Sequence, residues 1–220
     1  VWRRPELSQR DRSLVVISVL IATGKPAQLK VHLGRALGNG VTPTEASGVL
    51  TQLAFYAGWP SAVNAFDAFE QVFKARNVDL AALRAPLPRL PAMASDSDRA
   101  RSLSDELGTV APKFTQLTNE SVFNDLGRRS DLSVRDRSLV TLAALAAMGE
   151  SDHLDRYLKL GVESGLTQAQ IVEAMTHLAF YAGWPKATDA LKAVAHFAGQ
   201  GGFDNSERRG DASPNHFVGS

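Results

Sequence analysis

The stretch "TQLAFYAGWP" at residues 51–60 returns almost unchanged as "THLAFYAGWP" at residues 176–185. Nine of the ten positions agree, and the exception sets Gln52 against His177. In both copies an apolar run ends at a glycine and a proline follows two residues later, which is typical of one helix ending and the next beginning. The chain therefore contains the same helical corner twice.

The repetition covers most of the chain. A shift of 125 residues aligns "LSQRDRSLV" (7–15) with "LSVRDRSLV" (132–140), and eight of the nine residues are identical. The same shift, without a gap, pairs Leu29 with Leu154, Leu33 with Leu158, Gly40 with Gly165, Thr42 with Thr167, Trp59 with Trp184 and Pro60 with Pro185. Because solenoid repeats are about 20–50 residues long, this offset predicts a duplicated small domain.

Each copy shows the signals of helix ends. Ser8 and Ser133 fit the N-cap position, and an aspartate follows three residues later in an acidic variant of the capping box. The run "SLVVISVLIAT" (13–23) is apolar nearly all round, which predicts a helix buried on most sides. Later in each copy a glycine suited to a left-handed helix cap precedes a threonine cap that opens another helix. Strand-like alternation is absent from the sequence, so we expect an all-α protein.

We expect two tandem domains: the first repeat at 1–80, a proline-rich linker at 81–96, the second repeat at 97–199 and a tail at 200–220. Residues 97–131 add two helix-like stretches that the first copy lacks. If the duplication is symmetric, about 35 residues precede Val1, and any targeting signal would lie there. The glycine-rich tail is expected to be an extended arm on a neighbouring surface.

Composition excludes several classes of function. A chain that is 44% hydrophobic and 21% charged is typical of a globular protein, and a net charge of +1 argues against a nucleic-acid binder. No apolar run approaches the roughly 18 residues of a membrane span. The sequence has no cysteine, which excludes disulfides, thiolate metal ligands and a cysteine nucleophile.

The motifs "LSxRDRSLVTLAALAAMG", the "HL" at 32–33 before "NGVT", and "HLAFYAGWP" resemble the carboxymuconolactone decarboxylase family. That family is similar in fold to alkylhydroperoxidase D, an all-α domain that assembles as trimers or hexamers. The resemblance implies an intrachain pseudo-dimer of two such domains, and a homotrimer of two-domain chains. The thiol peroxidase branch of that fold is excluded, because it needs a CxxC pair and this chain has no cysteine.

The resemblance further implies a carboxy-lyase that needs no cofactor or metal. Its reaction would be the loss of carbon dioxide from 4-carboxymuconolactone in aromatic (protocatechuate/β-ketoadipate) catabolism, or from a similar small carboxylated lactone or carbonyl compound. Such a reaction needs cations for the carboxylates and the developing oxyanion, and an acid that protonates the ring carbon. Histidine suits the acid, and arginine pairs bidentately with carboxylates.

His32 and His177 are the candidate catalytic acids, since both match family histidines. The second copy has Tyr157 in place of the first, and the first copy has Gln52 in place of the second. Each repeat thus keeps one histidine and lacks the other. Two unlike sites, one composite site across the repeats, or drift in a copy kept for architecture would each explain this pattern.

Arginines and aromatic residues complete the candidate site. Arg12 and Arg137 match a family arginine and are expected to be catalytic cations, while Arg10 and Arg135 are candidates for substrate binding. Four aromatic residues could line the pocket: Tyr56, Trp59, Tyr181 and Trp184. The aspartates between the arginines, Asp11 and Asp136, are interpreted as helix caps.

Two hypotheses follow. The first is a cytoplasmic decarboxylase of a small anionic lactone, with neither nucleic acid nor membrane as a partner. The second is a catalytically degraded pseudo-dimer that serves as an assembly or small-ligand binding protein, motivated by the histidine lost from each copy.

Overall fold

The computed structural model describes residues 1–204, and both repeats in it are helical. The first repeat forms α1 (Gln9–Ala22), α2 (Pro26–Gly38), α3 (Pro43–Tyr56) and α4 (Trp59–Ala75). The second repeat forms α7 (Val134–Met148), α8 (Leu154–Glu163), α9 (Gln168–Ala182) and α10 (Trp184–Gly199). Equivalent helices follow one another in the same order, which confirms the tandem all-α fold.

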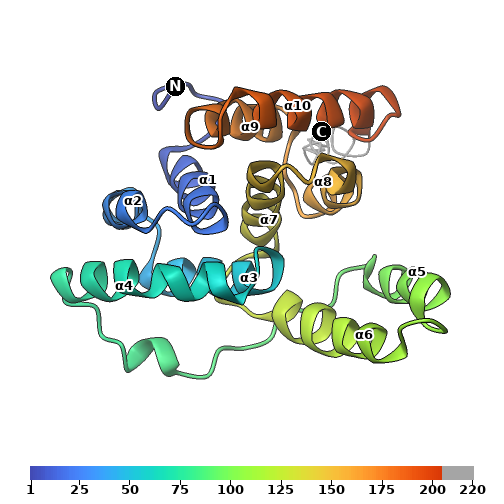
Figure 1. Cartoon of the computed structure of the whole chain (residues 1–220), viewed down its shortest axis with the longest axis horizontal. Helices are drawn as coiled ribbons and strands as arrows, with labels where there is room; N and C mark the ends of the chain where they lie inside the picture. Colours follow the sequence, from blue (N-terminus) through green and yellow to red (C-terminus); the bar gives the residue numbers. More distant parts are fainter. Residues whose placement is uncertain (205–220) are drawn as a thin grey trace, which may run out of the picture.

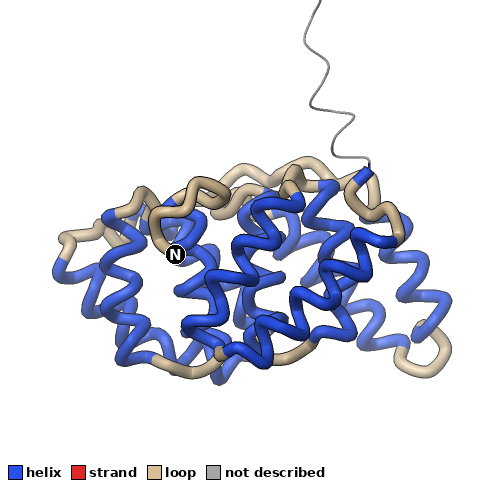
Figure 2. Tube along the Cα trace, turned by 90° about the horizontal axis from the view of Figure 1, so that it is seen from above, coloured by secondary structure: helices blue, strands red, loops and turns tan. Residues whose placement is uncertain are grey.

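The two repeats interlock around a central pair of helices. Figure 1 shows α1 and α7 in the middle, with α2 and α8 on their outer sides. The α9–α10 pair covers one side of this layer and the α3–α4 pair covers the other, and most loops lie at the two edges seen in Figure 2. Because α9 packs on α1 and α3 packs on α7, each central helix is covered by a helix of the other repeat.

Local capping explains where the helices begin. The hydroxyls of Ser8 and Ser133 accept hydrogen bonds from the backbone N–H groups three residues on, as the sequence predicts. Thr42 and Thr167 each form a complete capping box. The capping interpretation of the two aspartates needs a correction, because their carboxylates pair with arginines of the other repeat instead of closing a capping box.

The core runs through the central helices. Every residue from Asp11 to Ile21 in α1 is buried, and so is every residue from Leu139 to Ala147 in α7. Two helices that are apolar on all sides can be covered only if other helices surround them, and the interlocked arrangement supplies that cover. The prediction of an almost completely buried helix in each copy is confirmed.

The region between the repeats adds a smaller helical unit. It contains α5 (Asp96–Leu107), α6 (Pro112–Leu117) and a π-helix, Thr118–Asp125, which continues α6. This unit lies beside α3 and α8 in Figure 1. The preceding linker is mostly extended and forms one antiparallel bridge between Arg89 and Arg129. The two helical stretches expected within 97–131 are therefore present.

The predicted extended arm at 200–220 falls almost wholly outside the described residues. The described part of this segment, residues 200–204, includes Phe203, which is buried and packs edge-on against Phe197 of α10, with 5.0 Å between ring centroids. Within residues 1–204, no helix has the length and apolar character needed to cross a bilayer.

Candidate active sites at the repeat interface

Two clusters of polar side chains lie where the repeats meet, and each takes residues from both. The histidine site comprises Arg12 of α1, His32 of α2, and Glu173, His177 and Tyr181 of α9. The glutamine site comprises the residues at equivalent positions: Arg137 of α7, Tyr157 of α8, and Gly48, Gln52 and Tyr56 of α3. The structure thus brings together two unlike clusters of residues, and each cluster is built from both repeats.

Arg12 is held firmly at the base of the histidine site. Its side chain is fully buried, and Nη1 lies 2.8 Å from Glu173 Oε1. Its Nε donates to the carbonyl of Leu7 at 3.1 Å, and Nη2 donates to the carbonyl of Arg4 at 2.8 Å. Because most of its N–H groups already have partners, Arg12 positions its neighbours and is not the free carboxylate-binding cation that the sequence suggested.

The environment of His177 fixes its protonation state. Arg12 Nη1 lies 3.5 Å from His177 Nδ1. A guanidinium group can only donate, so Nδ1 accepts and the neutral ring carries its proton on Nε2. Burial first, and then the charge of Arg12, lower the pKa of His177 to about 4, although Glu173 opposes the shift. The ring is therefore neutral at pH 7, and its Nε2–H is a buried donor with no partner among the described residues.

His32 reaches the same site from the other repeat. Its ring meets the ring of Tyr181 edge-on, with 5.2 Å between centroids. The ring of Tyr181 also contacts that of His177, with 5.5 Å between centroids. Tyr181 thus contacts both histidines. The pKa of His32 is lowered by burial and by the charge of Arg35, and its Nδ1 is buried with no partner among residues 1–204.

Trp2 covers the histidine site. Its indole packs edge-on against the ring of His177, with 4.8 Å between centroids. Trp2 also lines an open cavity of about 630 Å³, whose wall includes Arg35 and Arg76. A cavity with two cations therefore shares a wall residue with the histidine site. The equivalent position in the second repeat is Gly127, so the glutamine site has no such cover from that position.

The glutamine site is built around Arg137 in a closely similar way. Its Nη1 donates to Gln52 Oε1 at 2.8 Å, and its Nη2 donates to Asp131 Oδ1 at 2.9 Å and to the carbonyl of Arg129 at 2.7 Å. Gln52 in turn donates to the hydroxyl of Thr141 at 2.9 Å. Gln52 therefore occupies the position of His177 and bonds the equivalent arginine, but it cannot exchange a proton near neutral pH.

The carboxylate that holds the arginine comes from a different place in each site. Glu173 of α9 supplies it in the histidine site, and Asp131, just before α7, supplies it in the glutamine site. The residue equivalent to Glu173 is Gly48. A Cβ atom at Gly48 would lie 2.9 Å from Leu132 Cγ and 3.1 Å from Asp131 Cγ, so the glycine leaves the space that these residues fill.

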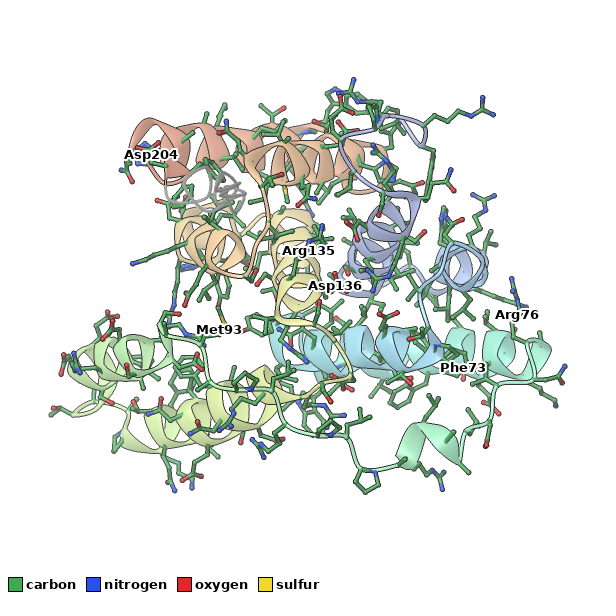
Figure 3. All side chains as sticks on the ribbon, turned by 180° about the vertical axis from the view of Figure 1, so that it is seen from behind. Phe73, Arg76, Met93, Arg135, Asp136 and Asp204 are labelled. Carbon is green, nitrogen blue, oxygen red and sulfur yellow. The ribbon has the colours of Figure 1, made fainter. Side chains whose placement is uncertain are left out.

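Arg10 and Arg135, the predicted substrate-binding arginines, join the repeats instead. Arg10 Nη2 lies 2.7 Å from Asp136 Oδ2, and Arg135 Nη2 lies 2.7 Å from Asp11 Oδ2. Figure 3 labels Arg135 and Asp136 on α7, near the middle of the molecule. The two ion pairs are reciprocal and offset the unfavourable placement of a cation at a helix N-terminus.

The predicted aromatic residues divide into two groups. Tyr56 and Tyr181 lie in the two sites, where each contacts a residue of the other repeat. Trp59 and Trp184 are 68% and 61% exposed. They meet Phe55 and Phe180 edge-on at the surface, because each lies at the start of a helix that turns away from the site. Their predicted pocket-lining role is replaced by a surface position.

Sequence reasoning missed Glu173, Asp131 and Trp2. The 125-residue alignment held a signal for Glu173, since a buried glutamate stands opposite Gly48 within otherwise matching helices. No comparable signal marks Asp131, whose equivalent is the exposed Glu6. Among residues 1–204, no group of three or more histidine, cysteine, aspartate or glutamate side chains is arranged to hold a metal ion.

Comparison with known proteins agrees with this architecture. The model of the carboxymuconolactone decarboxylase family matches residues 1–71 and 112–196, one region in each repeat. The two matched regions together cover more than half of the chain. The chain therefore belongs to the carboxymuconolactone decarboxylase family.

Two curated relatives are similar over one segment each. The 4-carboxymuconolactone decarboxylase of Acinetobacter baylyi is 42% identical over 74 residues, which are 34% of this chain and 55% of that protein. The nitrosuccinic acid decarboxylase of Metarhizium robertsii is 35% identical over 65 residues, which are 30% of this chain and 46% of that protein. The chain thus spans about half the length of the curated relatives that it matches.

Proposed function

We propose that the histidine site catalyses the cofactor-independent decarboxylation of a small anionic lactone or a related carbonyl compound. One observation carries the proposal. Two histidines from different repeats meet at Tyr181, beside a buried arginine–glutamate pair, and each has a buried ring nitrogen without a partner among the described residues. Family membership and the names of the two relatives support the same reaction class.

The chemistry assigns different roles to the two histidines. As the bond to the departing carboxylate breaks, its electron pair moves through the ring to the carbonyl oxygen and carbon dioxide leaves. The Nε2–H of neutral His177 would donate a hydrogen bond to that oxyanion. His32 would deliver the proton to the ring carbon, since a bound dianionic substrate raises the pKa of an adjacent histidine. His177 thus acts as an electrophile and not as the acid.

The substrate carboxylates need cations other than Arg12. Arg35 and Arg76 line the open cavity next to Trp2, and both side chains are exposed. We propose that this cavity is the entrance and that Trp2 moves aside when the substrate enters. A neutral, water-excluded site under an aromatic cover would also leave the departing carboxylate poorly solvated.

The test compares the two sites by exchanging their residues. His177→Gln and His32→Tyr each introduce the residue that the glutamine site already holds, so both changes are compatible with the local packing. We expect each to lower kcat on 4-carboxymuconolactone at least about 100-fold. The reciprocal variants Gln52→His and Tyr157→His are matched controls and should retain the activity. Nitrosuccinic acid should be assayed in parallel, because one relative is named for it.

Several outcomes would contradict the assignment. Full activity in His177→Gln and His32→Tyr would remove both histidines from the mechanism. Loss of activity in Gln52→His alone would move the reaction to the glutamine site. Carbon dioxide release can be followed directly, so the assay does not depend on the absorbance of one substrate.

A second function is favoured by the cover over the histidine site. His177 is fully buried, and Trp2 packs directly on it. A small-ligand binding protein with degraded catalysis would show this closed state and would bind the lactone without releasing carbon dioxide. Binding without turnover in the wild-type chain, unchanged by Trp2→Ala, would favour this candidate over the enzyme.

A further inference from the structure

The glutamine site contains a small cavity that the proposed reaction does not use. Its volume is about 50 Å³, and its wall includes Gln52, Tyr56, Arg99, Arg137 and Tyr157. These residues come from α3, α5, α7 and α8, so the small unit between the repeats closes the cavity on one side. Figure 3 labels Met93, another wall residue, where the linker passes between that unit and α8.

Two buried guanidinium donors in this wall lack partners. Arg137 is only 7% exposed, and its Nε has no hydrogen-bond partner among the described residues, although Asp131 and Gln52 hold its other nitrogens. Arg99 pairs with Asp96, and its Nε is also buried without a partner. A buried N–H group of a charged side chain is costly to leave unsatisfied, so the cavity favours a hydrogen-bond acceptor. The carboxylate of Asp96 also lines the cavity but is already paired with Arg99, so a ligand carboxylate would serve the remaining Nε–H donors.

An open groove lies next to the cavity. Its volume is about 940 Å³, and it shares four wall residues with the cavity: Tyr56, Val122, Phe123 and Tyr157. Apolar side chains dominate the groove, among them Phe114 and Leu117. The four shared residues, three of them aromatic, therefore separate the apolar groove from the cavity that holds the two Nε–H groups without partners.

The shared wall includes part of the π-helix Thr118–Asp125. The Phe123 ring of that helix lies near two guanidinium groups, 4.6 Å from Arg99 and 5.9 Å from Arg156. Tyr56 and Tyr157 meet edge-on with 5.7 Å between ring centroids, and both rings line the groove as well as the cavity. A π-helical turn is uncommon and often marks a functional site.

We propose that the glutamine site binds an aromatic monocarboxylate, with its carboxylate between Arg99 and Arg137 and its ring in the groove. A cavity of this size has room for about one or two waters, and so for a carboxylate but not for a whole ligand. Three carboxylates line the groove, those of Glu150, Asp152 and Asp155, against the single arginine Arg156, and this excess of negative charge disfavours a second carboxylate there. Because Gln52 and Tyr157 replace the two histidines, the site binds this ligand without turning it over.

Benzoate is the probe, and its neutral isostere benzamide is the ligand control. We expect saturable binding of benzoate by calorimetry or ligand-observed NMR, and binding at least about tenfold weaker for benzamide. Terephthalate, whose second carboxylate would lie among the acidic residues of the groove, should also bind more weakly than benzoate. These measurements use the whole chain and need no enzymatic turnover.

The protein controls separate a specific site from general charge. Arg99→Met should weaken benzoate binding about tenfold or more. Arg101→Met is the matched control, since Arg101 lies on the same helix, pairs with an aspartate three residues earlier and has a side chain that is 72% exposed. Ser138→Leu fills the cavity without changing charge, because among residues 1–204 the Ser138 hydroxyl bonds only the Val134 carbonyl of its own helix. It should abolish binding, and thermal melting of each variant shows whether it is folded.

Four results would overturn the proposal. The first two are equal affinities for benzoate and benzamide, and equal losses of benzoate affinity in Arg99→Met and Arg101→Met. The other two are unchanged benzoate affinity in a folded Ser138→Leu variant, and binding to the wild type that does not saturate at about 10 mM benzoate. Loss of benzoate binding in His177→Gln but not in Arg99→Met would assign the ligand to the histidine site. That result would leave the proposed decarboxylase standing, so the two proposals fail independently.

Discussion

At residue 177 an imidazole replaces an amide, and this single difference changes what the site can do. Gln52 and His177 both bond the buried arginine of their site. Of the two, only His177 can be protonated as the pH falls, because an amide side chain does not titrate. The burial that lowers its pKa also couples it to the stability of the fold.

His177 should make folding stability depend on pH. Its pKa is about 4 in the folded chain and about 6.5 when unfolded, so the unfolded chain binds the proton first as the pH falls. The stabilising contribution of the neutral ring is complete above pH 6.5 and is lost progressively as the pH falls to 4. We expect this to cost up to about 3 kcal/mol of unfolding free energy at pH 4.

Urea denaturation between pH 7 and 4 measures this effect. His177→Gln should flatten the decline by the amount attributed to the histidine, because glutamine does not titrate. His153→Gln is the control, since that histidine is exposed and should leave the profile unchanged. Identical profiles for the wild type and His177→Gln would show that the folded ring is protonated near its ordinary pKa.

The buried pair of Arg12 and Glu173 should be essential for stability. Both side chains are nearly or fully buried, at 0% and 3% exposure. Glu173→Gln leaves the guanidinium without a counter-charge, and we expect a loss of about 3–5 kcal/mol in unfolding free energy. Glu6→Gln is the control. Its carboxylate pairs with the exposed side chain of Arg4, so we expect its loss to cost less than about 1 kcal/mol. Equal, small losses in both variants would mean that the buried pair is not charged.

Sequence reasoning at this scale found residue types but not their partners. It identified both histidines and both buried arginines, since these stand in the repeated motifs. It expected Arg12 to act as a catalytic cation, because nothing in the linear order places Glu173, 161 positions away, beside it. The charge state of His177 likewise depends on burial, which only the packed structure determines.

At the scale of helices, the contact of α3 with the start of α7 depends on Gly48. A methyl group there would approach Leu132 and Asp131 more closely than ordinary contacts allow. Gly48→Ala should therefore destabilise the chain by about 1–3 kcal/mol, despite the higher helix propensity of alanine. Chemical denaturation gives the free energy directly.

Gly34→Ala is the matched control within α2. Nothing lies within 4 Å of a Cβ atom at that position, so the substitution should stabilise the chain by about 0.5–1 kcal/mol. The two alanine substitutions should therefore have opposite signs. A stabilising effect of Gly48→Ala would mean that α3 and Asp131 separate more readily than their close packing suggests.

Helix boundaries were the most predictable feature. Serine and threonine caps, the glycines before them and the corner prolines act through neighbouring residues, so the linear sequence contains the whole signal. The packing of α3 on α7, and of α9 on α1, was not predictable from the sequence. A central helix that is apolar on all sides can pack against helices of either repeat. This packing makes each site composite.

At the scale of the whole molecule, the exposed aromatic pairs indicate a surface for association. Phe55 with Trp59, and Phe180 with Trp184, occupy equivalent positions on the two repeats, and each pair stacks in the open. Large exposed aromatic residues are enriched where proteins bind each other. We expect the chain to form a homotrimer through these repeated surfaces.

Light scattering after size exclusion tests the assembly. The double variant Trp59→Ser, Trp184→Ser should shift the protein toward monomer, while Val110→Ser, at a position 84% exposed on the helical unit between the repeats, should not. A monomeric wild type, or an assembly that survives the double variant, would contradict the expectation.

Duplication itself was readable from the sequence, and so was the family. The difference between the two sites was visible in the sequence only in two aligned pairs, His32 with Tyr157 and Gln52 with His177. The Trp2/Gly127 and Glu173/Gly48 differences acquire meaning once α9 and α3 are seen to cross between repeats. Only then does it become clear that one site is covered by an indole and the other adjoins an apolar groove.

The crossing of α3 and α9 has an evolutionary consequence. In a dimer of identical chains, every substitution appears in both sites at once, so neither site can acquire a new task without the other. A single gene that encodes both halves lets each change occur once. Here one site holds two histidines, while its counterpart holds glutamine and tyrosine at the same positions. Fusion thus permits two sites of unlike chemistry within one polypeptide.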